Sequence, residues 1–215
     1  MRGFFGVLAG SVLVLASSGC LRKETTHTLY LSPAGEVHWQ IDESGVRSDE
    51  AEDGKRLEEE RAYILPALGG AHRAARGLQA LNPDGVVQTT VVREESPYHV
   101  ITAARFSRID RALGRLFTAC GLDASVTLTN EDDVTRLRMR FDFRKVIEPA
   151  DTPALALLED LGDFRFVLTD GRFIAGGGFD VPDRTRAVLS REALTSLTTA
   201  IDARQQIELV LAWTH

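Results

Sequence analysis

The chain contains few cysteines and no excess of positive charge, and these two shortages each exclude a class of protein. Only Cys20 and Cys120 occur among its 215 residues, so a small fold held together by several disulfides is excluded. The formal net charge is −6 at pH 7, whereas a nucleic-acid-binding domain carries an excess of lysine and arginine. We therefore expect a domain stabilised by packing, with no nucleic-acid partner.

Motifs for metal binding and catalysis are also missing. The sequence has no His-x-x-x-His motif, and its one Glu-x-x-His, Glu24 to His27, falls in an extended segment where this spacing does not bring the two side chains together. It has no Gly-x-Ser-x-Gly motif of the serine hydrolases either. We predict that the protein binds no metal and no cofactor, has no catalytic residues and is not an enzyme.

A long apolar run is present only a few residues from the start of the chain. Arg2 precedes the thirteen predominantly apolar residues Phe4–Ala16, and the small residues Ser17-Ser18-Gly19 follow them. This order is typical of a secretory signal peptide. A permanent membrane helix would need about 20 apolar residues, so the pattern favours a cleaved signal over a membrane span.

A cysteine stands directly after the small residues of this signal. The stretch Ala16-Ser17-Ser18-Gly19-Cys20 resembles the lipobox of bacterial lipoproteins, which signal peptidase II cleaves. It departs from the usual pattern at Ser17, where leucine is commoner. The resemblance implies that the thiol of Cys20 receives a diacylglyceryl group and that its freed amine is acylated. The alternative is an ordinary signal peptide cut near Ala16 or Ser18, which would leave Cys20 as a free thiol.

Lipidation at Cys20 predicts where the protein resides. Several acyl chains, at about 0.8 kcal/mol per buried methylene, would hold the mature chain stably at a membrane. Leu21 occupies the position where lipoproteins retained at an inner membrane often have aspartate. By resemblance to this sorting pattern, we expect a protein of the cell envelope that is anchored in the outer membrane and faces the periplasm.

Strand-like and helix-like segments alternate along the rest of the chain. Hairpins are predicted from alternating apolar residues and turn residues, and helices from apolar residues three and four apart. The predicted hairpins are 26–42, 86–106, 124–145 and 166–175, the predicted helical segments are 48–68, 74–81, 108–120, 154–161 and 190–201, and further strands are 185–189 and 206–214. We predict an α+β fold, with an antiparallel sheet built from hairpins and about three to four helices packed on one side.

The domain organisation follows from the signal and from the composition. We expect a signal peptide over 1–19, a short lipidated tether over 20–26 and a single α+β domain over 27–215. The prolines near 149–153 mark a possible subdomain boundary. No internal repeat is evident.

In three of these hairpins the turn residues predict which residues of the two strands lie opposite one another. In the first, a loop of Pro33, Ala34 and Gly35 places Leu31 opposite Val37 and Leu29 opposite Trp39. In the second, a loop over 130–133 places Leu128 opposite Thr135, Val126 opposite Leu137 and Ala124 opposite Met139. In the third, a two-residue Asp170-Gly171 turn places Leu168 opposite Phe173 and Phe166 opposite Ala175.

A row of arginines is the sharpest binding hypothesis. Arg136, Arg138, Arg140 and Arg144 are expected to share one face of a strand, opposite an apolar face. Guanidinium groups suit phosphate and carboxylate, so the row could bind anionic lipid or an acidic envelope protein. The alternative is a solvated sheet face whose charge is balanced by acids of the same domain, such as Asp142.

Two other features have structural interpretations. Cys120 lies on the apolar face of a predicted helix, which favours a buried structural residue over a catalytic one. The run Gly176-Gly177-Gly178 lacks the lysine and the helix of a phosphate-binding loop, so we expect a bulge or bend of the strand there.

Two classes of function remain open. The first is a non-enzymatic binding or interaction module, attached to the membrane through its lipid anchor, with an envelope protein or anionic lipid as partner. The second is a carrier that holds an apolar ligand between sheet and helices. The stretch Leu29–Gly35, an extended segment with a Pro-x-Gly turn, resembles the LppM-like lipoproteins, and this resemblance slightly favours the carrier. An enclosed apolar cavity of several hundred Å³ would distinguish the two.

Overall fold

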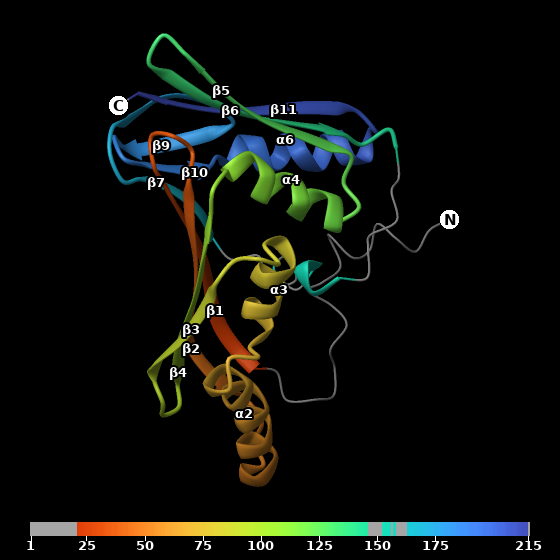
Figure 1. Cartoon of the computed structure of the whole chain (residues 1–215). Coiled ribbons are helices and arrows are strands. Elements are labelled where there is room, and N and C mark those ends of the chain that lie inside the picture. The colour runs from red at the N-terminus through yellow and green to blue at the C-terminus, as the bar shows by residue number, and fades with distance from the viewer. Residues whose placement is uncertain (1–20, 146–151, 156, 158–162, 215) are drawn as a thin grey trace.

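The computed structural model describes residues 21–145, 152–155, 157 and 163–214, which form two β-sheets with helices packed against them (Figure 1). Sheet A has seven strands, in the spatial order β3 (Val87–Arg93), β4 (Tyr98–Phe106), β2 (Val37–Ser48), β1 (Leu21–Leu31), β7 (Asp163–Leu168), β10 (Arg186–Leu189) and β9 (Phe179–Asp183). Sheet B has four strands, β5 (Ala124–Glu131), β6 (Val134–Asp142), β11 (Gln206–Thr214) and β8 (Arg172–Gly177).

The described helices are α2 (Asp53–Leu68), α3 (Arg73–Leu81), α4 (Ile109–Ala119) and α6 (Arg191–Asp202), with a 3₁₀ turn, η1, at Pro153–Leu155. The α+β class is confirmed. Most of the helical segment expected over 154–161 and of the boundary expected at 149–153 lies outside the described residues, as do the predicted signal peptide and Cys20. No helix within the described ranges is long and apolar enough to span a membrane.

The expectation of one antiparallel sheet is wrong. Strands β1 and β7 of sheet A are parallel, with Leu29 opposite Phe166 and Leu31 opposite Leu168. β2 occupies one edge of β1 through the first hairpin, so the other edge is left to a strand that returns from far along the chain. A second sheet forms from β5, β6, β8 and β11, which are separate from sheet A.

The register predicted for the first hairpin is confirmed. Leu31 lies opposite Val37 and Leu29 opposite Trp39, and Gly35 closes the turn with φ of 87°. β1 begins at Leu21, not at Thr26, so residues 21–26, which we expected in a polar tether, belong to the sheet. The hairpin is therefore longer at its open end than the sequence indicated.

The register predicted for the second hairpin is wrong by two residues. Leu128 lies opposite Leu137, and the loop is the two-residue turn Asp132-Asp133, with φ of 51° and 63°. Aspartate tolerates this left-handed conformation, and a two-residue turn with both φ values positive matches the twist of the strands. Because a shift of two residues leaves every side chain on the same face, the alternation of apolar residues could not exclude it.

The third predicted hairpin does not form. β7 pairs with β1 and β10 in sheet A, whereas β8 pairs with β11 in sheet B. The Asp170-Gly171 turn is present, with Gly171 at φ of 90°, but the chain passes there from one sheet to the other. Phe173 accordingly packs edge-on against Trp213 of β11, with ring centroids 6.2 Å apart.

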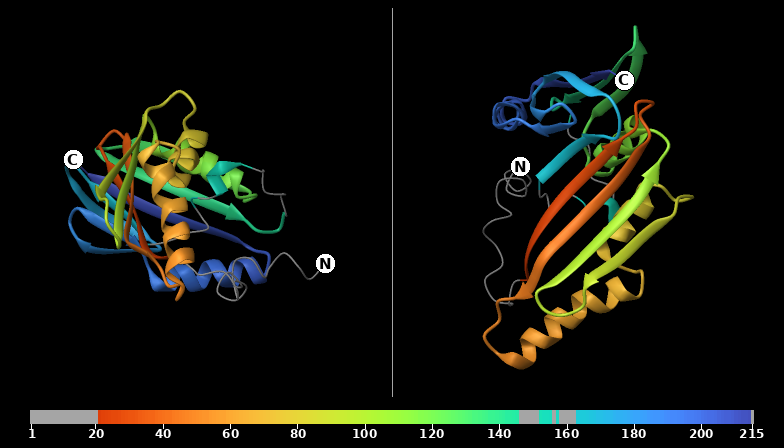
Figure 2. Two further views of the ribbon diagram at one scale, coloured as in Figure 1. Left: turned by 90° about the horizontal axis from the view of Figure 1, so that it is seen from below. Right: turned by 90° about the vertical axis from the view of Figure 1, so that its left-hand side faces the viewer.

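One continuous core joins the two sheets. α3 packs on sheet A, and α4 and α6 lie against one face of sheet B, so that α4 sits between the sheets (Figures 1 and 2). The cluster of buried side chains includes Leu29 and Trp39 of sheet A, Leu113 of α4, and Leu137 and Trp213 of sheet B. The described part of the chain is therefore one packed body.

The packing of α3 generates a test with a matched control. In Gly77→Ala the added methyl of α3 would meet Leu157 Cδ2 at 2.7 Å and the Pro153 carbonyl oxygen at 3.2 Å. We expect the free energy of unfolding to fall by about 1–3 kcal/mol, because buried Leu157 must shift. In Gly114→Ala of α4 nothing lies within 4 Å of the new carbon, and the free energy should rise by about 0.5–1 kcal/mol. Urea unfolding followed by circular dichroism measures both, and equal effects would contradict the contact of α3 with Pro153 and Leu157.

Candidate functional site

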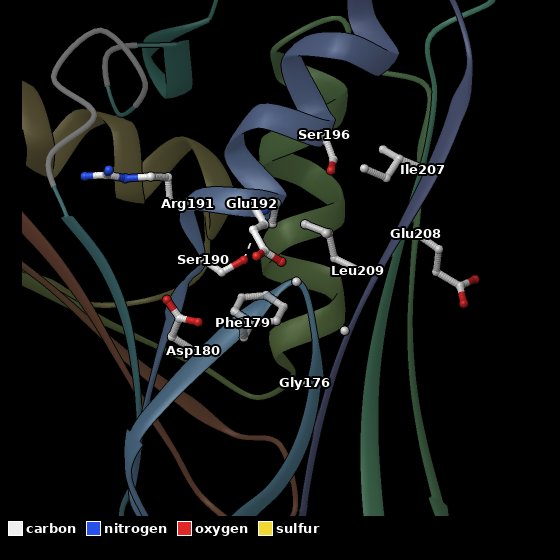
Figure 3. A pocket seen from close by; sticks show the side chains of 13 residues that line it. Gly176, Phe179, Asp180, Ser190, Arg191, Glu192, Ser196, Ile207, Glu208 and Leu209 are labelled. Carbon is white, nitrogen blue, oxygen red and sulfur yellow. Dashed lines mark hydrogen bonds between the residues drawn. The ribbon is translucent and has the colours of Figure 1, made fainter.

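An open groove of about 660 Å³ lies where the chain passes from β8, at the edge of sheet B, to β9, at the edge of sheet A (Figure 3). This volume is within the range of ligand pockets in proteins. Its walls are the Gly176–Gly178 corner, the first turns of α6 and the start of β11. The apolar lining comes from Phe179, Ala193, Ile207 and Leu209, and the polar lining from Asp180, Ser190, Arg191, Glu192, Ser196 and Glu208.

The glycine corner explains why the strand can leave sheet B. Gly178 has φ of 92°, and a Cβ atom there would lie 2.5 Å from Leu209 Cδ2. A Cβ atom on Gly176 would lie 2.9 Å from that of Phe179. Only glycine combines this conformation with these close approaches. The bend that we expected at the glycine run is present, and it forms one wall of the groove.

The start of α6 forms the second wall. Ser190 Oγ accepts a hydrogen bond from Ala193 N at 3.0 Å, and Ser190 N donates to the Gly178 carbonyl oxygen at 3.0 Å. Ser190 is therefore the N-cap of α6, and its backbone attaches the helix to the glycine corner.

The groove has an acidic character. The Glu192 side chain lies over Phe179 and Leu209, while Arg191 extends away from the groove (Figure 3). Within the described ranges, neither Glu192 nor Asp180 takes part in an ion pair. Both carboxylates are therefore available to a positively charged ligand.

The groove is not the cavity that a carrier of apolar ligands needs. It is open to solvent and carries carboxylates at its rim. A second hollow, of about 10 Å³, lies between β1, β2 and α3, and it has room for about one water molecule. Neither hollow is an enclosed apolar space of several hundred Å³.

The arginine row lies on the outer face of sheet B, and acids of the same domain contact most of it. Arg136 is 3.6 Å from Glu131, and Arg140 is 3.0 Å from Glu208. Arg138 is exposed, between Thr127 and Val210, and makes no ion pair with a described residue. The geometry favours the solvated, charge-balanced face over a continuous anion-binding row.

Arg144 is not on the strand with the other three arginines. It follows the end of β6 and folds back, so that its guanidinium contacts the Asp142 carboxylate at 2.5 Å and 2.8 Å. Hydrogen bonds from Arg144 and from the Gln206 amide hold the pKa of Asp142 well below its usual range, and the same ion pair raises the pKa of Arg144. Arg144 is therefore already satisfied within the domain.

Cys120 lies at the end of α4 and is half-buried. Its Sγ donates a hydrogen bond to the Leu116 carbonyl oxygen at 2.8 Å, and burial raises its pKa to about 12. The thiolate is the nucleophilic form of cysteine, and it is scarce at neutral pH when the pKa is this high. This environment agrees with our expectation that Cys120 is a structural residue and not a catalytic one.

The raised pKa of Cys120 predicts low reactivity in the native state. At pH 8, the shift from 9.0 to about 12 lowers the thiolate fraction by roughly a thousandfold. We expect alkylation by iodoacetamide, followed at the Cys120 peptide by mass spectrometry, to be slower in the native protein than in urea by a factor of that order. Equal rates in the two states would contradict the burial of this thiol.

A buried polar cluster, not predicted from the sequence, connects β1, β2 and the start of α3. Glu43 Oε1 lies 2.5 Å from Lys23 Nζ, and Glu43 Oε2 lies 3.4 Å from His72 Nε2. The side chains of Glu43 and His72 are at most 4% exposed. The alternation along β2 places Glu43 on the same face as Trp39 and Ile41. This alternation is the feature of the sequence from which the burial of Glu43 could have been predicted.

Two of the other described histidines, His27 and His99, have polar partners of their own, and His38 packs edge-on against Tyr30. Trp39 Nε1 donates to His27 Nδ1 at 3.2 Å, and the His27 ring stacks on Phe164 with centroids 4.5 Å apart. His99 Nε2 lies 3.0 Å from Asp42 Oδ1. Among the described residues, no group of three or more His, Cys, Asp or Glu side chains could hold a metal ion.

The Glu43 cluster predicts a large loss of stability when it is broken. Glu43→Ala leaves the part-buried Lys23 and the buried His72 without this carboxylate, and we expect the free energy of unfolding to fall by about 3–5 kcal/mol. The control is Glu52→Ala, which breaks an exposed pair with Lys55 and should cost less than about 1 kcal/mol. Thermal or urea unfolding compares the two variants, and a loss at Glu43 as small as that at Glu52 would show that the cluster is solvated.

Comparisons with known proteins yield little. No protein-family model matches the chain, and no curated protein matches it. Among solved structures, the NMR structure of the folded domain of the Mycobacterium tuberculosis LppM protein is weakly similar, with 12% sequence identity and a TM-score of 0.39 over 94% of each chain. A likeness at this level establishes neither a shared fold nor a shared function.

Proposed function

We propose that this chain is a lipid-anchored protein of the bacterial cell envelope that works as a non-enzymatic binding module. In this proposal Cys20 carries the acyl chains, the anchor lies in the outer membrane, and the folded body faces the periplasm, where it binds another envelope protein. The observation that carries the proposal is the Met1–Cys20 pattern of a lipoprotein signal, followed at once by a folded strand.

The start of β1 supports a short, firm attachment. Leu21 pairs with Ser48 of β2, and Arg22 Nε donates to Asp49 Oδ2 at 3.0 Å. Consecutive Cα atoms are about 3.8 Å apart, so a lipidated Cys20 would lie within one residue of the sheet. The body would then stand directly on the membrane surface, without a flexible linker.

The two ends of β1 separate the anchor from the groove. Leu21 is at the end of sheet A near α2, whereas β7, β10 and β9 pair along the Leu31 half of the sheet, close to sheet B (Figures 1 and 2). Eleven residues of strand span roughly 35 Å. A body anchored at Cys20 would therefore hold the groove away from the bilayer, where other envelope proteins can reach it.

Acylation at Cys20 is directly testable. Cells expressing the full-length chain and given an alkyne-bearing palmitate analogue should incorporate the label into the wild-type protein and fractionate it with membranes. Cys20→Ser should abolish the label and prevent the loss of residues 1–19. Cys120→Ser is the matched control and should keep both label and fractionation, because its thiol lies in the folded body. An unlabelled wild-type chain in a detergent-free soluble fraction would refute the anchor.

A further inference from the structure

We propose that the groove binds an extended peptide segment that adds as a strand to the open edge of β11 and carries lysine or arginine side chains. The inference rests on the proposed role as a binding module and names the chemistry of its partner. The groove is defined as above by the Gly176–Gly178 corner, the start of α6 and residues 207–209.

The start of β11 has a strand on one side only. β6 pairs with β11 along its full length, from Gln206 to Thr214, whereas β8 pairs with it only from Val210 onward. β8 leaves at Gly177, and the carbonyl oxygen of Gly178 accepts a hydrogen bond from Ser190 N. Over Gln206–Leu209, the backbone groups of every second residue therefore point into the groove, with no described strand beside them.

An unpaired strand edge is a template for another strand. Such an edge binds extended peptides through main-chain hydrogen bonds, and pockets for alternate side chains add specificity. The edge of β9 in sheet A contains Pro182, which cannot donate to a partner, whereas Gln206–Leu209 contains no proline. Every backbone N–H of this stretch is therefore able to donate a hydrogen bond.

The groove also offers what the side chains of a segment would need. Phe179, Ile207 and Leu209 provide an apolar floor beneath the open edge (Figure 3). β5, at one edge of sheet B, has mostly exposed polar residues and does not line the groove. A strand added at β11 would place alternate side chains on this floor.

The charges favour a basic segment. Glu192 and Asp180 form no ion pair among the described residues, and the Arg191 side chain extends away from the groove. Glu208 is held on the outer face by Arg140. The Ser190 hydroxyl caps the start of α6, so the positive end of that helix is already partly satisfied. Lysine or arginine side chains of a bound strand would meet two free carboxylates.

The test uses the mature protein, extracted in mild detergent, and fluorescein-labelled seven-residue peptides. The basic probe is TVKVKVT, with valines on one face and lysines on the other, and the acidic probe is TVEVEVT. Two further basic probes carry methyl groups on every second backbone nitrogen, one in each frame. Fluorescence anisotropy measures binding, and hydrogen exchange measures protection of the amides of Gln206–Leu209.

We expect the basic probe to bind and to protect these amides, and not those of β5. The acidic probe and at least one methylated probe should bind at least about tenfold more weakly. Glu192→Lys should weaken binding of the basic probe by about tenfold, whereas Glu58→Lys, exposed on α2 away from the groove, should leave it unchanged.

Each contrary result removes a stated part of the inference. Equal binding of both methylated probes would overturn strand addition, and equal binding of the acidic probe would overturn the preference for basic segments. Failure of every probe to bind, or binding that Glu192→Lys and Glu58→Lys weaken equally, would overturn the site. Acylation of Cys20 is measured separately with the palmitate label. A failure of the peptide-binding hypothesis can therefore be distinguished from a failure of the lipid-anchor hypothesis.

Discussion

The turn of the first hairpin, Ser32–Glu36, is the contact on which both sheets depend. The Gly35 carbonyl oxygen accepts a hydrogen bond from Ile109 N at 2.9 Å, and so fixes the start of α4. The Pro33 carbonyl oxygen accepts from Thr135 Oγ1 at 3.3 Å and from Trp213 Nε1 at 3.4 Å, and so joins sheet B. Gly35 is irreplaceable there for two reasons, because its φ is 87° and any Cβ atom would overlap Leu128.

This turn explains how much of the fold the sequence could predict. Turn chemistry and alternation both specified the register of the first hairpin, and the two signals agreed on Leu29 opposite Trp39. In the second hairpin the alternation allowed two registers, and only the backbone of Asp132 and Asp133 distinguishes them. Neither signal could reveal that β7 pairs with β1, because these partners are more than a hundred residues apart and no local turn connects them.

The candidate site was also hard to predict, because residues far apart in the sequence form it. The groove combines residues near 176–180, 190–196 and 207–209, and only the glycine run was visible as a local feature. The arginines of β6 were predicted to share a face, but their acidic neighbours depend on strand pairing. Arg140 meets Glu208 because β11 lies beside β6, and that pairing joins residues 68 positions apart.

Sheet B thus separates two surfaces of different electrostatic character. On its outer face the arginines are largely neutralised by neighbouring acids, so a long-range attraction to anions is weakened there. At its interrupted edge the balance is reversed, because Glu192 and Asp180 lack basic partners among the described residues. The glycine corner creates both conditions at this edge, since it ends the pairing of β8 with β11 and brings α6 alongside. Backbone groups of β11 and two carboxylates are thereby left without partners among the described residues, and this is the physical reason for placing binding at the edge of sheet B and not on its face.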